Sequence, residues 1–151
     1  MKKLFLVLLL SLGLIGNTSA DIIDTNTLTL IESGSCEKCI LEGADLSLAD
    51  LSGANLSKAN LMMADLRGTN LSKANLMMAT LNGVSFNSAN LIEANLSLTT
   101  MHSAILDGAD LRGANLSGAN LAWVSFAGAD LRGADFYKAV LNLTSFDAAN
   151  L

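Results

Sequence analysis

The chain has 151 residues, of which 51% are hydrophobic and 15% charged, with no proline and a formal net charge of −5 at pH 7. This length suits one domain with a sizeable core, and the acidic balance excludes direct binding of nucleic acid as a main function. Without Lys2 and Lys3 the charge would be −7, because 7 basic residues would face 14 acidic ones.

Residues 1–20 have the pattern of a secretory signal peptide. Two lysines precede an apolar run that ends near Ile15, and small residues lead to Ala20. The alternative is an uncleaved membrane anchor, for which the run is short. We therefore expect cleavage after Ala20, export to the periplasm or the extracellular space of a bacterium, and no stable membrane insertion of the mature chain.

Residues 21–35 are predicted to form a lead-in, or N-terminal cap, to the domain that follows. Ile22 and Ile23 come first, then an alternating stretch that ends at Leu30, and then Gly34. A strand and a short helix both fit this pattern, and either would cover the open end of the domain.

Cys36 and Cys39 follow directly. In an exported protein, such a pair predicts a disulfide or two buried thiols. The alternative is a redox-active pair similar to the thioredoxin motif, but no βαβ pattern surrounds it. A zinc site would need two further ligands, and His102, the one histidine, lies far along the chain.

From Leu41 to Leu151 the chain repeats one five-residue pattern without a break in register. Counting every fifth residue gives 23 central positions, of which 18 are Leu, four are Phe and one is Met101. The residue two places earlier is Ala in 17 of the 23 cases, and the residue between them is Asp or Asn in 15. We expect the apolar centre and the small earlier residue to be buried.

A period of five fits neither a straight helix nor a continuous strand. Every fifth residue of an α-helix lies about 140° further round, which would spread the leucines over all sides. In a strand, an odd period would point successive leucines to opposite faces. The pattern instead predicts a bend in each five-residue unit, so that four bends of about 90° close a coil of about 20 residues and coils stack about 4.8 Å apart.

The pattern of Ala, Asp or Asn, Leu and two variable residues, as in Ala54-Asn55-Leu56-Ser57-Lys58, resembles that of the pentapeptide-repeat family. The resemblance implies an all-β domain over residues 36–151, a right-handed quadrilateral β-helix of five to six coils. Glycines at the last position of the pattern suit its turns. Carried backward, the register places Cys36 on a Leu position and Cys39 on an Ala position, so both should face inward.

Residues 20 apart should share one face of the coil. The face centred on Leu61, Leu81, Met101, Leu121 and Leu141 is the least polar, and Trp123 and Leu143 should be neighbours in successive coils. Its candidate interaction residues are Met62, Met63, Trp123, Val140 and Leu143. An ordinary surface is the alternative, because scattered apolar surface residues are normal.

The residues on the other faces indicate structural roles rather than an active or ligand-binding site. Asp110 and Asp130 each stand two residues before an arginine, which predicts a ladder of weak surface pairs. Phe86 and Phe126 predict a repacked core rather than a cofactor pocket. His102 falls on an outward position with no nucleophile tied to it. We expect no catalytic residue, no metal site and no cofactor.

At Leu151 the sequence is still inside the repeat, without a polar cap. An uncovered last coil presents unpaired strand edges and core leucines. We expect this coil either to fray or to stack on another copy, as a homodimer through the C-terminal coil.

These observations predict an exported, non-enzymatic structural or protein-interaction scaffold with an unknown protein partner. The family resemblance implies one alternative, because some members are acidic dimeric rods that mimic DNA, bind DNA gyrase and protect it from quinolones. The export signal argues against it, since gyrase is cytoplasmic. A thiol-redox protein that uses Cys36 and Cys39 is the other alternative, and it requires an exposed thiol of low pKa.

Overall fold

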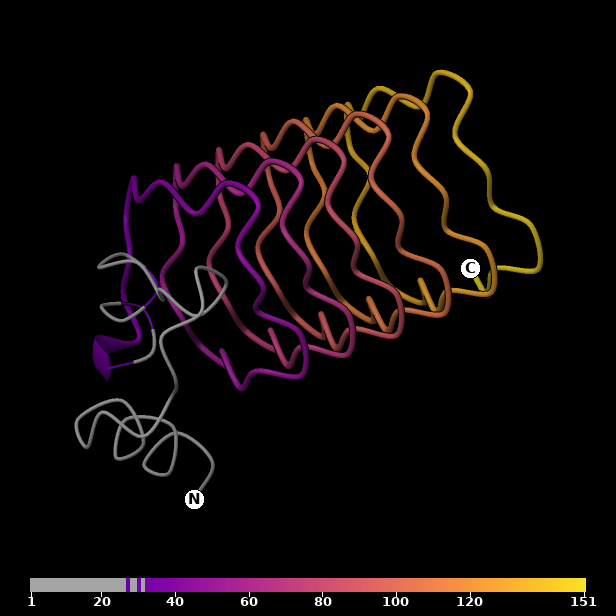
Figure 1. Ribbon diagram of the computed structural model, residues 1–151. Coiled ribbons are helices and arrows are strands. Elements are labelled where there is room, and N and C mark those ends of the chain that lie inside the picture. Colours follow the sequence, from indigo (N-terminus) through magenta and orange to yellow (C-terminus); the bar gives the residue numbers. More distant parts are fainter. Residues whose placement is uncertain (1–26, 28–29, 31) are drawn as a thin grey trace.

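The computed structural model describes Thr27, Leu30 and residues 32–151, so the predicted signal peptide and most of the lead-in lie outside the described residues. From residue 35 onward the chain winds into coils that stack side by side along one axis (Figure 1). Parallel β-bridges join residues 20 positions apart, from Ser35 with Asn55 to Asp130 with Asn150. The predicted coil of 20 residues is confirmed.

A tight turn bends the chain once in each five-residue unit. In one of them, the N–H of Ala44 donates to the carbonyl of Leu41 at 3.1 Å, and Gly43 between them has a φ of 67°. The equivalent residue has a positive φ in every turn from Lys38 to Ala148, as a type II turn requires of its third residue. Fourteen of these residues are not glycine. Each such residue costs about 1–2 kcal/mol of backbone strain.

Large apolar side chains at the turn ends lean over a glycine of the next coil. A Cβ atom on Gly118 would lie 2.7 Å from Cδ2 of Leu98, and one on Gly83 would lie 2.5 Å from Sδ of Met63. The side chain of one coil therefore occupies the space that the glycine of the next coil leaves free.

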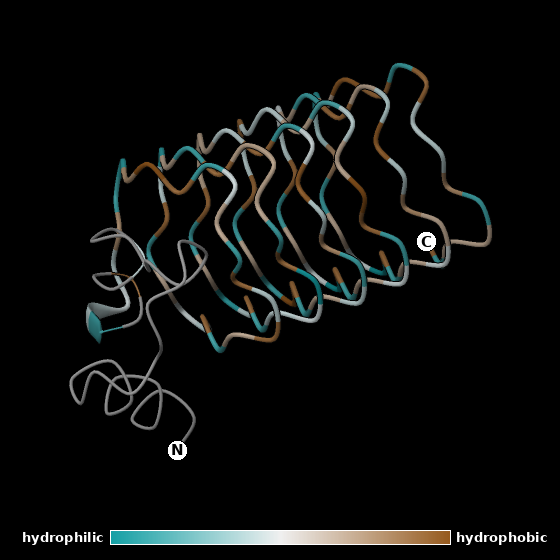
Figure 2. Cartoon of the chain, in the orientation of Figure 1, coloured by the Kyte–Doolittle hydropathy of each residue, from teal (hydrophilic) through white to brown (hydrophobic). Residues whose placement is uncertain are grey.

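The interior is filled by the central residues of the repeat. Every centre from Leu41 to Leu131 is buried, and most of the Ala residues two places earlier are buried with them. Hydrophobic and hydrophilic residues alternate along the coils in Figure 2. Phe86 and Phe126 are both fully buried, so these larger residues fill the core as predicted.

Backbone hydrogen bonds join each coil to its two neighbours. The N–H groups of Leu96 and Leu98 donate to carbonyls of the next coil at 2.7 and 2.9 Å, and that of Asn95 donates to a carbonyl of the previous coil at 2.9 Å. A fourth N–H in each unit closes the turn. Because most of these bonds run between coils, each coil depends on its neighbours for stability.

The Asp or Asn of the repeat accepts the fifth N–H of its unit. Oδ1 of Asn95 accepts the N–H of Ser97 at 3.1 Å and its hydroxyl at 2.7 Å. Where this position has another residue, the previous coil can supply the acceptor: Oδ1 of Asn82 accepts the N–H of His102 at 2.9 Å. This bond explains the preference for Asp and Asn, which the repeat pattern alone left without a cause.

A helical segment precedes the first coil. Thr27, Leu30, Glu32 and Ser33 are helical, and Leu30 is fully buried in the same core cluster as the central leucines. Gly34, with a φ of 68°, donates its N–H to the carbonyl of Leu30 at 2.9 Å and ends the helix. Of the two structures compatible with the lead-in, the described residues adopt the helix. No helix within the described part of the chain could cross a membrane.

Three phenylalanines lie together near the other end of the core. The rings of Phe126 and Phe146 are stacked with centroids 5.3 Å apart, and Phe136 meets both edge-on at 6.1 and 6.0 Å. Phe126 is buried, whereas Phe136 and Phe146 are half-buried and Leu141 is 42% exposed. The core of the last described coil is therefore open on one side.

Candidate functional site

Large apolar side chains gather on one face of the solenoid, which we call the Trp123 face. We define it by three columns of residues spaced 20 apart. Each residue of the middle column directly precedes a central residue of the repeat, and the two edge columns are the turn residues of positive φ on either side. The middle column is Ile40, Asn60, Thr80, Thr100, Asn120 and Val140; the first edge is Lys38, Lys58, Met78, Leu98, Gly118 and Lys138; the second edge is Gly43, Met63, Gly83, Ser103, Trp123 and Leu143. Bridges connect successive members of the middle column, so it runs along the axis of the solenoid.

Four of the five sequence-predicted residues of this face are exposed. Met63 is 67% exposed, Trp123 59%, Val140 44% and Leu143 68%, whereas Met62 is half-buried. The structure brings two of them together: the N–H of Trp123 donates to the carbonyl next to Leu143 in the chain, that of Asn142, at 2.9 Å. These two side chains belong to successive coils.

The methionines lie further away on the same edge. Met63 precedes Trp123 by 60 residues, which is three coils of 20 residues, and Gly83 and Ser103 separate them. Three coils correspond to about 14 Å along the axis. Four of the five predicted residues therefore share this face without forming a single cluster, and Met62 lies in the turn beside Met63, outside its columns.

The sequence reasoning missed the first edge of the face. Met78 is 50% exposed, Leu98 56% and Tyr137 66%, and Nζ of Lys138 lies 5.0 Å from the centre of the Tyr137 ring. The signal was available, because the turn that precedes a face borders it as closely as the turn that follows. Of the 12 large apolar side chains that are exposed in the described part of the chain, seven belong to the three columns of this face: Ile40, Met63, Met78, Leu98, Trp123, Val140 and Leu143. Tyr137 lies just outside the first edge, next to Lys138.

The charges of the Trp123 face differ from those of the remaining surface. Its three columns contain three lysines and no Asp or Glu. Two carboxylates lie beside its N-terminal end: Glu37 lies 4.0 Å from Lys38 and 3.5 Å from Lys58, and Glu42 accepts a hydrogen bond from Nδ2 of Asn60 at 3.2 Å. On a chain of net charge −5, this face is apolar and weakly basic.

Three aspartates on the other faces pair with arginines. Asp65, Asp110 and Asp130 each meet the arginine two residues later, at 2.6, 2.8 and 2.7 Å, and Arg112 also approaches Asp130 at 3.9 Å. The predicted ladder of surface pairs is confirmed. The hydrogen bond from each arginine lowers the pKa of its aspartate and raises the pKa of the arginine. These pairs are exposed, so they contribute little to stability. The contribution is complete above the ordinary pKa of aspartate and is lost as the pH falls through the lowered pKa of the folded state.

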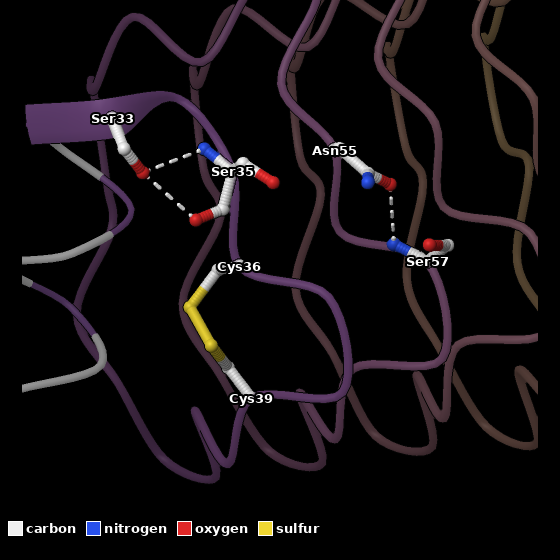
Figure 3. Close-up of a disulfide and its surroundings, with 6 residues drawn as sticks. All are labelled: Ser33, Ser35, Cys36, Cys39, Asn55 and Ser57. Carbon is white, nitrogen blue, oxygen red and sulfur yellow. Dashed lines mark hydrogen bonds between the residues drawn. A yellow bond between two sulfur atoms is a disulfide. The ribbon is translucent and has the colours of Figure 1, made fainter.

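Cys36 and Cys39 form a disulfide at the first coil (Figure 3). Their Cα atoms are 5.3 Å apart, and the N–H of Cys39 donates to the carbonyl of Cys36 at 3.3 Å, so the bond spans a single turn. Cys36 is 2% exposed, and Cys39 is half-buried against the core. An external thiol has little access to Cys36, and this favours a structural bond over a redox-active one.

Other reactive groups do not converge into a site. His102 is exposed, and its backbone N–H bonds to Asn82. Oδ1 of Asp107 accepts hydrogen bonds from the hydroxyl of Ser125 at 2.5 Å and from the N–H of Ala127 at 3.2 Å, which joins two coils. In the part of the chain that the structure describes, no three His, Cys, Asp or Glu side chains are grouped as a metal ion would need.

Two sequence profiles match the coils. The profile described as a pentapeptide repeat region matches residues 79–151, and that described as pentapeptide repeats (8 copies) matches residues 35–67 and 59–97. The chain belongs to the pentapeptide repeat family. This confirms the resemblance seen in the five-residue pattern. Pentapeptide repeat proteins are in general structural or interaction scaffolds rather than enzymes.

Solved structures of pentapeptide repeat proteins are similar to this chain. One from the thylakoid lumen of Arabidopsis thaliana is 26% identical with a TM-score of 0.61, over 62% of this chain and 66% of its own. One from the cyanobacterium Cyanothece 51142 is 26% identical with a TM-score of 0.39, over 83% and 96%. QnrB1, a plasmid-mediated fluoroquinolone resistance protein, is 17% identical with a TM-score of 0.47, over 78% and 67%.

The family match and the Arabidopsis structure identify the fold of the coils as a right-handed quadrilateral β-helix. The match spans slightly less than two thirds of the Arabidopsis protein, at 66% of its length. No curated protein matches the sequence.

Proposed function

We propose that this pentapeptide repeat protein is an exported, non-enzymatic scaffold that docks another protein or an envelope component through its Trp123 face. The observation that carries the proposal is the concentration of seven of the 12 large apolar side chains that are exposed in the described part of the chain on a face whose columns hold no carboxylate. Large exposed apolar patches on soluble proteins mark interaction sites. Five to six coils between residues 36 and 151 would present this face on a rod about 25–30 Å long.

Three observations support an exported location, in the periplasm or outside the cell. Residues 1–20 have the pattern of a signal peptide. Cys36 and Cys39 form a disulfide, and such bonds persist in oxidising compartments. The similar Arabidopsis protein comes from the thylakoid lumen, which also lies across a membrane from the site of synthesis.

A pull-down from envelope extract tests the proposal. The wild-type protein should enrich a defined component, and Trp123→Ala should lose it because the face would lose its largest side chain. Leu48→Ala is the matched control, since Leu48 is 73% exposed at a turn end away from the Trp123 face. Equal enrichment by wild type and Trp123→Ala would show that the face is wrongly chosen.

The charge pattern favours a scaffold over the DNA-mimic alternative. A mimic of the phosphate backbone needs rows of unpaired negative charge. Here Asp65, Asp110 and Asp130 are each paired with an arginine at 2.8 Å or less. The acidic columns are therefore partly neutralised along the rod.

We also propose that two copies join through the C-terminal coil. In the part of the chain that the structure describes, the N–H groups of Phe136, Leu141 and Phe146 donate to no backbone carbonyl, and Leu141 is 42% exposed. A second copy that stacks on this edge would cover the half-buried phenylalanines. Sedimentation velocity at micromolar concentration should show a dimer, and a monomer under those conditions would contradict the proposal.

A further inference from the structure

We infer that the component docked by the Trp123 face is the surface of a lipid bilayer. This inference rests on the face assigned under the proposed function and commits it to one kind of surface. In this mode of binding, the side chains of the face contact the headgroups and the upper part of the acyl chains. No described helix could cross the bilayer.

The arrangement of the apolar side chains is the first argument. They stand in two rows, with Met78 and Leu98 on the first edge and Met63, Trp123 and Leu143 on the second, each at least 50% exposed. The middle column between the rows has mostly short Asn and Thr side chains. Protein interfaces concentrate their anchors at a buried centre, whereas parallel rows of anchors at the borders of a face suit a broad, deformable surface.

The distribution of charge is the second argument. The charged residues in the columns of this face are Lys38, Lys58 and Lys138, and the carboxylates beside them are Glu37, 4.0 Å from Lys38 and 3.5 Å from Lys58, and Glu42, which accepts a hydrogen bond from Asn60 at 3.2 Å. The other carboxylates of the described residues, which an anionic membrane would repel, lie outside these columns. Lys138 lies 5.0 Å from the Tyr137 ring, which places a cation beside an amphipathic aromatic at one end of the first edge. Lysines and Tyr or Trp side chains are the residues that anchor proteins at the headgroup level.

The same charges argue against a second copy on this face. Packing two such faces in antiparallel order would bring Lys138 of each copy toward the end that carries Lys38 and Lys58 in the other. Glu37 compensates Lys38 and Lys58 in part, at 4.0 and 3.5 Å, but the columns supply no carboxylate for Lys138. Anionic headgroups would compensate these lysines, and this is why we expect phosphatidylglycerol to strengthen binding.

Trp123 is the only tryptophan of the chain, so its fluorescence reports on this face alone. Adding vesicles of equimolar phosphatidylcholine and phosphatidylglycerol to the exported protein should shift the Trp123 emission to shorter wavelength, and brominated lipids should quench it. Vesicles of phosphatidylcholine alone should give weaker binding. No shift with either vesicle would overturn the inference.

Matched variants separate this face from any other route to the vesicle. Leu143→Ser and Leu98→Ser should each lower the partition coefficient about tenfold, because each removes one buried aliphatic side chain from the contact. Leu48→Ser should leave it unchanged, since Leu48 has a similar turn-end position, with a φ of 57° against 55° at Leu143, away from this face. Leu98 lies in an interior coil, so fraying of the last coil would not account for its effect.

Two results would contradict the inference even if vesicles bind. An equal loss in the Leu48→Ser variant would mean that exposed apolar residues act without regard to their face. Equal binding by Leu143→Ser, Leu98→Ser and wild type would mean that another part of the chain holds the vesicle. If a protein is enriched in the pull-down while vesicles are not bound, the lipid inference fails and the proposed function stands.

Discussion

Replacing Leu81 by alanine should lower the free energy of unfolding by about 2–5 kcal/mol. Leu81 is fully buried, and the coils before and after it are joined to its own by backbone bonds. Truncation would therefore leave a cavity that neighbouring coils cannot close without losing those bonds. Urea denaturation followed by circular dichroism measures the loss, provided that the transition remains two-state.

Leu141→Ala is the matched control for this prediction. Leu141 occupies the same column three coils later, since 141 − 81 = 60, but it is 42% exposed because no further described coil covers it. Its truncation should cost less than half as much as that of Leu81, since it forfeits less buried surface and leaves no closed cavity. Equal losses at the two positions would contradict the burial that the fold assigns to them.

Replacing Asn95 by alanine should cost about 1–3 kcal/mol, the second largest effect that we expect. Oδ1 of Asn95 accepts both the N–H and the hydroxyl of Ser97, and Ser97 is only 8% exposed. Without this oxygen, two donors in a buried turn would have no acceptor, while the rest of the coil would stay in place. The same urea titration measures this loss.

Asn95→Asp tests whether the acceptor oxygen is the cause. Aspartate keeps an oxygen at the same place but cannot donate to Oδ1 of Asn75, as Nδ2 of Asn95 does at 3.4 Å, so this variant should lose less than the alanine variant, which loses the oxygen as well. Asn120→Ala is a second control, because Asn120 accepts only one N–H, that of Ala122, at 3.2 Å in an exposed turn. If Asn95→Asp is as unstable as Asn95→Ala, the oxygen is not what the turn needs.

The fold was predictable because a period of five allows few alternatives. The burial of every centre from Leu41 to Leu131 follows from that period alone. The role of the Asp and Asn position was not predicted, because it depends on where one backbone N–H points within the turn. That direction depends on the backbone dihedral angles of the turn. The side chains do not reveal these angles, since Met63, Leu98 and Trp123 occupy a position of positive φ that favours glycine.

The candidate face was predicted in part for a related reason. Residues 20 apart are predicted to form one column, and this correctly placed Trp123 and Leu143 in successive coils. The first edge was missed because Met78 and Leu98 belong to the unit before the face, although the turn that precedes a face borders it as closely as the turn that follows. The five-residue repeat does not indicate what binds this face, because its exposed positions are free to vary.

The leaning of Leu98 over Gly118, and of Met63 over Gly83, has a consequence for protein engineering. Repeat proteins invite the shuffling or duplication of single modules, because their backbones superpose. In this chain a duplicated 20-residue module would set a bulky turn residue above its own copy, where a glycine had been. A graft that contains Leu98 or Met63 should therefore carry the next coil with it, so that Gly118 or Gly83 stays beside the side chain that leans over it.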